Sequence, residues 1–118
     1  MEIKSEIRGK VTIVHIIGKL DSAASQAAEE RIKQYLDANR NCCIVLDMSG
    51  CGYVSSAGLR LLLLAGKQLQ SNGGQWVFAG LLEEVADVIN VTGFSNFFKI
   101  FPRVEDAIKS LENKNAAH

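Results

Sequence analysis

The sequence predicts a single α/β domain with a mixed, mostly parallel sheet of about five strands and about four helices. A length of 118 residues fits one domain, and a hydrophobic fraction of 47% is enough to fill one core. Strand-like and helix-like segments follow one another in the order β-β-α-β-α-β-α-β-α. Strands that alternate with helices imply parallel neighbours with right-handed crossovers, here after an initial antiparallel hairpin.

The first half of the chain shows a hairpin, a helix and a central strand. Residues 2–8 alternate between apolar and charged side chains, and residues 11–17 are rich in β-branched residues, with Gly9-Lys10 as the turn between them. A helix is expected over 23–38, capped by Asp21 or Ser22. Residues 42–46 are apolar at every position, which is typical of a strand covered on both faces.

The second half repeats the pattern of strand and helix. Residues 47–52 are expected to form a polar exit loop, followed by a helix over 57–71 that ends at Asn72-Gly73-Gly74. A buried strand over 75–80, a short helix over 81–89, a last strand over 97–101 and a helix over 104–111 complete the domain. We therefore assign residues 1–112 to the domain and 113–118 to a flexible tail.

Composition excludes several classes of function. The 13 basic and 13 acidic residues cancel, so no charge excess favours direct nucleic-acid binding. No apolar run approaches the ~20 residues of a membrane span, and no secretory leader opens the chain, so a soluble cytoplasmic protein is expected. The three cysteines match no metal pattern and are expected to be reduced and structural, with Cys51 the one that can be exposed. No cofactor is implied.

The polar segment between the central strand and the next helix carries the candidate site. Ser55 and Ser56 lie where that helix begins, and free backbone N–H groups there favour negative charge. A phosphate on a serine at this position gains hydrogen bonds without melting the fold. The simpler interpretation is that one serine is only an N-cap, worth about 1 kcal/mol.

Two motifs resemble those of the STAS family, and more narrowly those of the single-domain anti-sigma factor antagonists of bacterial partner-switching systems. They are GKLD at residues 18–21 and YVSSAGLR at residues 53–60. The resemblance implies that Ser56 is phosphorylated by a cognate serine kinase that is also the anti-sigma factor, and that a serine phosphatase resets it. The family commonly has Asp before the acceptor, so Ser55 stands as an alternate acceptor here.

The resemblance also implies a partner surface and a mode of action. The protein is expected to be a monomer that binds its partner when unphosphorylated and catalyses nothing. Asp21 matches an acidic position of the partner surface in relatives, and it can cap a helix at the same time. The expected partner-binding residues are Asp21, Ser55, Ser56, Ala57, Gly58, Arg60 and Leu61.

Other interpretations remain open at this point. A STAS domain can act as a scaffold without phosphorylation, or can hold a small anion or nucleotide at the Ser56 helix start. An enzyme needs a nucleophile such as Ser56 or Cys51 beside a base, but His15 falls in mid-strand and no G-x-S-x-G motif occurs. The apolar residues Leu61, Leu64 and Ala65 lie off the inner stripe of their helix, which means either burial or a patch for a partner.

Overall fold

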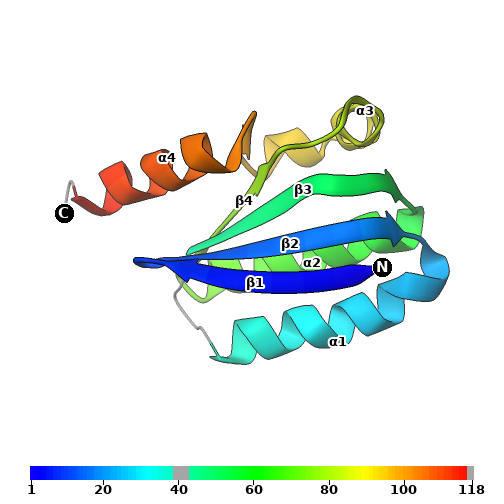
Figure 1. Ribbon diagram of the computed structural model, residues 1–118, viewed down its shortest axis with the longest axis horizontal. Coiled ribbons are helices and arrows are strands. Elements are labelled where there is room, and N and C mark those ends of the chain that lie inside the picture. The colour runs from blue at the N-terminus through cyan, green and yellow to red at the C-terminus, as the bar shows by residue number, and fades with distance from the viewer. Residues whose placement is uncertain (39–42, 117–118) are drawn as a thin grey trace.

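The computed structural model describes residues 1–38 and 43–116 of the chain (Figure 1). The strands are β1 (Glu2–Arg8), β2 (Val11–Leu20), β3 (Cys43–Val54), β4 (Gln75–Ala79) and β5 (Ile100–Phe101). The helices are α1 (Ser22–Ala38), α2 (Ser56–Ser71), α3 (Glu83–Val91) and α4 (Val104–Ala116), with one turn of 3-10 helix, η1 (Phe94–Asn96), before β5. None of these helices is both long and apolar enough to cross a membrane.

The sheet confirms the predicted fold class. Its strands lie in the order β1-β2-β3-β4-β5, so each strand pairs with its neighbours in the chain. The β1–β2 pair is antiparallel, and the β2–β3, β3–β4 and β4–β5 pairs are parallel. The element order β-β-α-β-α-β-α-β-α is the one that the sequence pattern predicts.

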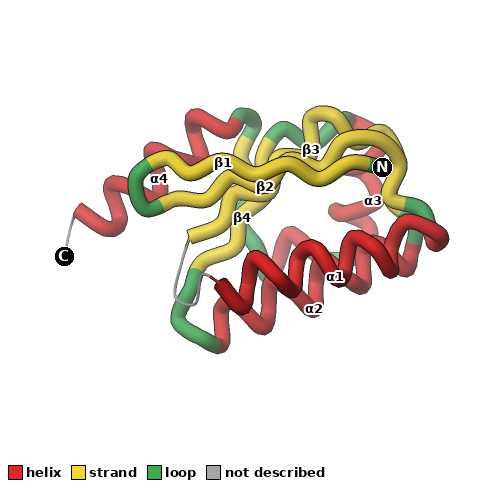
Figure 2. Tube along the Cα trace, turned by 60° about the horizontal axis from the view of Figure 1, so that its bottom comes forward, coloured by secondary structure: helices red, strands yellow, loops and turns green. Residues whose placement is uncertain are grey.

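Two hydrophobic clusters form on the two faces of the sheet. Helices α1 and α2 lie side by side on one face, where they and α3 enclose the larger cluster around Ile16, Leu46 and Phe78 (Figure 2). Helix α4 covers part of the other face, with Ala107, Ile108 and Leu111 packed on strands β2, β3 and β4 (Figure 1). Because α4 leaves most of β1 and half of β2 uncovered, that part of the sheet meets solvent.

Helix α2 approaches the sheet closely through a glycine. A Cβ on residue 66 would lie 2.6 Å from the ring of Phe98 and 2.7 Å from Cδ1 of Trp76, so only glycine lets the helix backbone reach these rings. The position of α2 matters for the candidate site because Ser56 is the first residue of this helix.

Strand β3 is longer than expected. Residues 47–52 were expected to be a loop, but β3 continues through them to Val54, paired with β2 as far as Leu20–Val54. Two register shifts opposite His15–Lys19 of β2 accommodate the extension, because β3 has one extra residue at each of them. Cys51 faces the core in this strand and is fully buried, so the expectation that it is exposed was wrong.

The C-terminal part differs from the sequence prediction in two further places. Strand β5 keeps only Ile100 and Phe101 of the expected 97–101, because η1 precedes it and the side chain of Phe98 is buried in the core. Helix α4 runs to Ala116, beyond the expected end at Leu111. The division into a domain over 1–112 and a tail remains a prediction, and Cys42, the expected start of the central strand, lies outside the described residues.

Candidate functional site at the start of helix α2

The ends of two parallel strands bring the two sequence motifs together. Leu20, the last residue of β2, is the register partner of Val54, the last residue of β3. The backbone N–H of Ser55 donates to the carbonyl of Leu20 at 2.9 Å. Asp21 and Ser55 therefore begin their two helices beside one another, although they are 34 positions apart in the chain.

The two adjacent serines have different environments. Ser55 is the N-cap of α2: it has extended backbone angles, its hydroxyl accepts from the N–H of Gly58 at 3.1 Å, and it is 8% exposed. Ser56 is the first helical residue and its side chain is exposed. Within the described residues, the hydroxyl of Ser56 makes no hydrogen bond. Of the two candidate acceptors, only Ser56 thus presents a free hydroxyl to solvent.

Gly58 lets the start of α2 lie against the end of β2. A Cβ at this position would lie 2.9 Å from both the Cγ and the carbonyl oxygen of Leu20. Contacts below 3.0 Å to backbone are not tolerated without movement, so a side chain here would push the start of α2 away from β2. Gly58 therefore sets the position of the Ser56 hydroxyl relative to Asp21.

The remaining predicted partner residues lie around Ser56 with different exposure. Asp21 is half-buried and caps α1, because its carboxylate accepts from the N–H of Ala24 at 2.8 Å. Ala57 and Arg60 are exposed, and Leu61 is half-buried. An open hollow of about 430 Å³ begins beside Asp21 and is lined also by Lys19, Gly52, Tyr53 and Glu84. Tyr53, which is 50% exposed, and Glu84 of α3 extend the candidate surface beyond the residues that the sequence suggested.

Helix α2 presents one large apolar residue, Leu64, to solvent. Ala65 is buried and Leu61 is half-buried, both in the groove between α1 and α2. Leu64 is 55% exposed at the rim of the same groove. The sequence left open whether Leu61, Leu64 and Ala65 are buried or form a patch for a partner. Packing against α1 buries Ala65 and half-buries Leu61, and it leaves Leu64 exposed to solvent.

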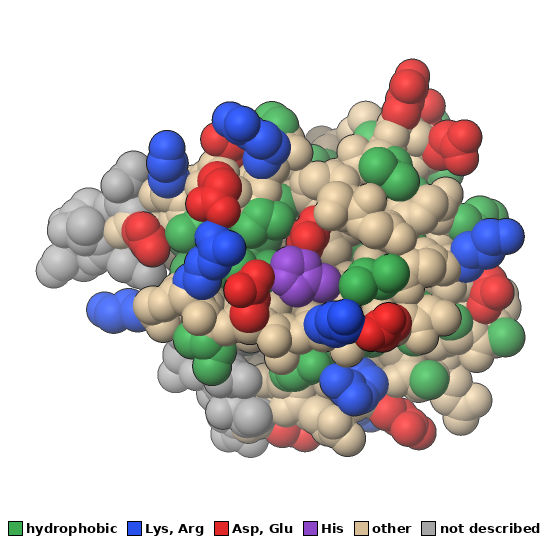
Figure 3. All heavy atoms as spheres, viewed as in Figure 1, with side chains coloured by type: hydrophobic (Ala, Val, Ile, Leu, Met, Phe, Trp, Pro, Cys, Tyr) green, Lys and Arg blue, Asp and Glu red, His purple; other side chains and the backbone are tan. Residues whose placement is uncertain are grey.

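A cluster of ionisable residues lies on the uncovered sheet face and was not predicted. Nδ1 of His15 lies 2.6 Å from Oδ2 of Asp47, and Nε2 lies 3.0 Å from Oε1 of Glu6, so the imidazole joins β1, β2 and β3. On the face drawn in Figure 3, a histidine side chain lies among acidic and basic side chains. No sequence signal could find the cluster, because it depends on the register of three strands.

The environment of Asp47 favours its ionised form. Burial works to raise the pKa of this carboxyl, but hydrogen bonds from Ser49 and from His15 outweigh burial and hold the pKa below its usual value. Both ring nitrogens of His15 form their hydrogen bonds with carboxylates, those of Asp47 and Glu6. The imidazole is therefore not paired with the hydroxyl of Ser56 or the thiol of Cys51 and does not activate either of them. In the described part of the chain, no group of three His, Cys, Asp or Glu side chains is arranged to hold a metal ion.

Comparisons with known proteins agree with this fold and with these motifs. The family model described as "STAS domain" matches residues 2–107. BtrV of Bordetella bronchiseptica, a candidate anti-sigma factor antagonist, is 34% identical over 83 residues, which cover 70% of this chain and 71% of BtrV.

Solved structures of low sequence identity share the fold. An anti-sigma factor antagonist from Mycobacterium paratuberculosis superposes with a TM-score of 0.85 at 21% identity, over 94% of this chain and 93% of the other. The unphosphorylated form of the antagonist SpoIIAA superposes with a TM-score of 0.79 at 17% identity, over 95% and 97% of the two chains. SpoIIAA from Bacillus in its phosphorylated form gives a TM-score of 0.71 at 16% identity, over 93% and 99%.

Proposed function

Because the chain belongs to the STAS domain family, and within it to the anti-sigma factor antagonists, we propose that phosphorylation of Ser56 switches its docking onto an anti-sigma factor that is also a serine kinase. As an anti-sigma factor antagonist the chain is a regulator and not an enzyme. The unphosphorylated protein docks with its Ser56 edge and displaces whatever the kinase was holding. A serine phosphatase restores the docking form.

The observation that carries the proposal is the contrast between the two serines. The hydroxyl of Ser55 is committed to the N–H of Gly58 and is buried, whereas that of Ser56 is exposed and open to a visiting kinase. The determination of SpoIIAA in a phosphorylated form supports the proposal, because that protein shares this fold. Ser55 becomes an acceptor only if the cap of α2 opens, so we assign the phosphate to Ser56.

The effect of the phosphate is electrostatic. It adds about −1.5 to −2 charges at the centre of the docking edge, beside the half-buried carboxylate of Asp21. An unpaired charge that is desolvated in an interface costs several kcal/mol, and each 1.4 kcal/mol is tenfold in affinity. The N–H groups at the start of α2 stabilise the phosphate within its own domain, so the fold does not need to rearrange. Asp21, Ser56, Ala57, Arg60 and Leu61 form the partner surface in this scheme, and Ser55 and Gly58 hold it in place.

Phosphate mapping tests the proposal. A pull-down from the native cell, read by mass spectrometry, identifies the serine kinase, and the purified kinase with ATP and Mg²⁺ is then incubated with three forms of the protein. We expect one phosphate on Ser56 in the unsubstituted protein and in Ser55→Ala, and none in Ser56→Ala. A phosphate on Ser55 that survives in Ser56→Ala would contradict the assignment.

A second candidate function is the binding of a small anion or nucleotide at the start of α2. The exposed start of α2 also suits a small anion or a nucleotide phosphate, as in a STAS module that senses a ligand without being phosphorylated. A thermal-shift screen against phosphate, GTP and ATP separates the two functions. A rise in melting temperature with phosphate, GTP or ATP that disappears in Ser56→Asp would favour the sensing module. An unchanged melting temperature with all three ligands favours the phosphorylation switch.

A further inference from the structure

Strand β1 is an open edge of the sheet. It comes first in the order β1-β2-β3-β4-β5, so within the described residues only β2 pairs with it. Six of its seven residues are exposed, and helices α1 and α2 lie in the layer below the sheet in Figure 2. An exposed edge strand presents unpaired backbone N–H and C=O groups. The outer side of β1 is therefore a surface to which a further strand can be added.

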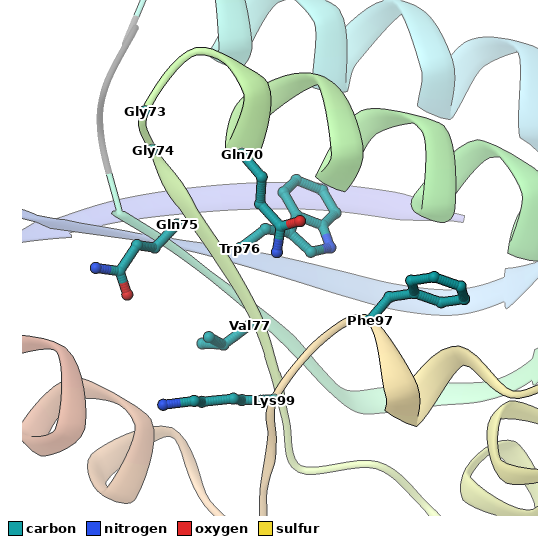
Figure 4. Close-up of a pocket in the computed structure, with 8 residues that line it drawn as sticks. All are labelled: Gln70, Gly73, Gly74, Gln75, Trp76, Val77, Phe97 and Lys99. Atoms are coloured by element: carbon teal, nitrogen blue, oxygen red, sulfur yellow. The ribbon is translucent and has the colours of Figure 1, made fainter.

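The opposite edge of the sheet is closed. Strand β5 has only two residues, and before it begins a cleft of about 390 Å³ lies beside β4. Trp76 of β4 is 1% exposed there, and Gln70, Phe97 and Lys99 also line the cleft (Figure 4). Because β4 is buried at this residue, a long free backbone edge exists only at β1 within the described part of the chain.

The hairpin turn fixes which backbone groups of β1 face outward. Gly9, with a φ of 61°, and Lys10 form a two-residue turn, so the flanking residues Arg8 and Val11 are a hydrogen-bonded pair. Such pairs alternate along an antiparallel ladder, and the register of β1 with β2 is continuous. The residues that turn their N–H and C=O groups away from β2 are therefore Ile3, Ser5 and Ile7.

The outward groups of these residues are accessible. Ser5 is exposed, and Ile7 is 73% exposed. The side chain of Ile3 is packed in the core, but its carbonyl accepts from Nη2 of the exposed Arg31 at 3.3 Å, so this carbonyl points away from β2 and can be reached. A carbonyl oxygen has two lone pairs, so the long contact with Arg31 leaves Ile3 able to accept from a second chain.

The charges of β1 are complementary to those of a second, antiparallel copy of β1. When Ser5 lies opposite Ser5 of the second copy, Glu2 lies opposite Arg8 and Lys4 lies opposite Glu6, and the twofold symmetry gives each pair twice. All four charged pairs then have opposite signs. A slip of two residues in either direction keeps the backbone pairing but turns every charged pair within β1 into a like-charge pair. Opposite charges across a strand pair stabilise it and like charges destabilise it, so the sequence selects this register.

The contact also extends ion pairs that exist within one copy. Nζ of Lys4 lies 3.3 Å from Oε2 of Glu2, and Nη1 of Arg8 lies 2.7 Å from Oε1 of Glu105. The second copy brings a further carboxylate to each of these bases, which joins isolated surface pairs into networks. On the face covered by α1, the exposed Ile7 comes to lie beside the core of the second copy and loses contact with water.

We infer that β1 is a dimerisation edge: two copies of the chain join through antiparallel β1 strands centred on Ser5 and form one continuous sheet. The contact uses the free edge of β1 in both copies, so assembly ends at the dimer. A strand pair of this length is a small interface, so the dimer forms at high protein concentration and exchanges with the monomer. This replaces the monomer that the resemblance implies. No residue of β1 belongs to the surface around Asp21 and Ser56, so both docking edges stay open.

Two charge variants of β1 test the inference. Lys4→Glu places a carboxylate opposite Glu6 of the second copy, and Glu6→Lys places an ammonium opposite Lys4, so each variant repels a copy of itself. In an equimolar mixture of the two variants, all four charged pairs across the contact again have opposite signs.

Sedimentation velocity from about 10 µM to about 1 mM protein measures the association. We expect the unsubstituted protein to form a dimer across this range, each variant alone to bind itself at least tenfold more weakly, and the mixture to recover the dimer. Lys109→Glu, a charge reversal on the exposed side of α4, is the control and should dimerise like the unsubstituted protein.

Nuclear magnetic resonance locates the contact. When unlabelled Glu6→Lys is added to ¹⁵N-labelled Lys4→Glu, the amide resonances of Ser5 and Ile7 should move, while those outside β1 report that both variants are folded. The inference is overturned if the unsubstituted protein stays monomeric at 1 mM, if Lys4→Glu associates as tightly as it does, or if the mixture stays monomeric. None of these results bears on phosphorylation of Ser56, which is read by mass spectrometry.

Discussion

Ser55 and Ser56 are neighbours in the chain but differ in what substitution should do, because Ser55 caps α2 and Ser56 is the proposed phosphate acceptor. Ser55→Ala removes the side-chain acceptor for the N–H of Gly58, and we expect it to lower the free energy of unfolding by about 1 kcal/mol. Ser56→Ala removes an exposed hydroxyl without a partner, so it should change the free energy of unfolding by less than about 0.5 kcal/mol. Urea denaturation of both variants checks this. Equal losses would show that the cap is shared by the two serines.

The close contact between Gly58 and Leu20 predicts that a side chain at position 58 destabilises the protein. Gly58→Ala places a Cβ 2.9 Å from the Leu20 carbonyl oxygen, and we expect it to destabilise the protein by about 1–3 kcal/mol, although alanine is the better helix former by up to about 1 kcal/mol.

Gly52→Ala is the matched control, because no atom lies within 4 Å of a Cβ at that position. Its free energy of unfolding should stay within about 0.5 kcal/mol of the unsubstituted protein. Thermal and urea denaturation of the two variants measure the difference. If Gly58→Ala were as stable as Gly52→Ala, the close approach of α2 to β2 would not constrain the site.

The motif at residues 53–60 implied Ser56 as the phosphate acceptor with Ser55 as an alternate, but it left open which of the two serines caps α2. The cap is the residue between the end of β3 and the first turn of α2, so its identity depends on where β3 ends. Sequence reasoning expected that strand to end near residue 46, and it ends at Val54.

Among the secondary-structure elements, the helices whose apolar residues recur at helical spacing were predicted well. The length of β3, which depends on its pairing with β2, was not. The helices α1 and α2 show regular apolar faces, and the observed bounds differ from the prediction by one residue at one end. The second half of β3 contains Ser49, Gly50 and Gly52, which resemble a loop. It is a strand because the end of β2 lies beside it and provides the backbone partners for strand pairing. This tertiary contact overrides the local propensity of the segment.

The His15 cluster predicts how the pairing of β1, β2 and β3 responds to acid. The pKa of Asp47 is depressed in the folded state, so this carboxylate contributes stability above its unfolded pKa, near 3.8. That contribution is lost as the pH falls through the lower, folded pKa.

Unfolding free energies from pH 6 to pH 2 test this prediction. The Asp47→Asn variant should be less stable than the unsubstituted protein at pH 6, and the difference should shrink as the pH falls below about 4. The Asp106→Asn variant changes an acidic residue of α4 outside the cluster and serves as the control. A difference that stays constant down to pH 2 would show that the Asp47 carboxylate is not stabilised in the folded state.

The molecule as a whole separates the proposed docking edge from its core. Ser56 lies at one end of the sheet, outside both hydrophobic clusters, so a charge placed there should not disturb packing. We expect the melting temperature of Ser56→Asp to stay within about 2 °C of that of the unsubstituted protein, since surface changes are usually within ±0.5 kcal/mol. Differential scanning calorimetry measures it. A fall of 5 °C or more would mean that the charge acts by loosening the fold.

The affinity of the purified kinase for the protein with and without a phosphate on residue 56 tests the central claim most directly. Isothermal titration calorimetry with the two forms, prepared from one batch and checked by mass spectrometry, gives both dissociation constants. We predict that the phosphate weakens binding by at least about 100-fold while the circular dichroism spectrum stays the same. Equal affinities of the two forms would contradict the account.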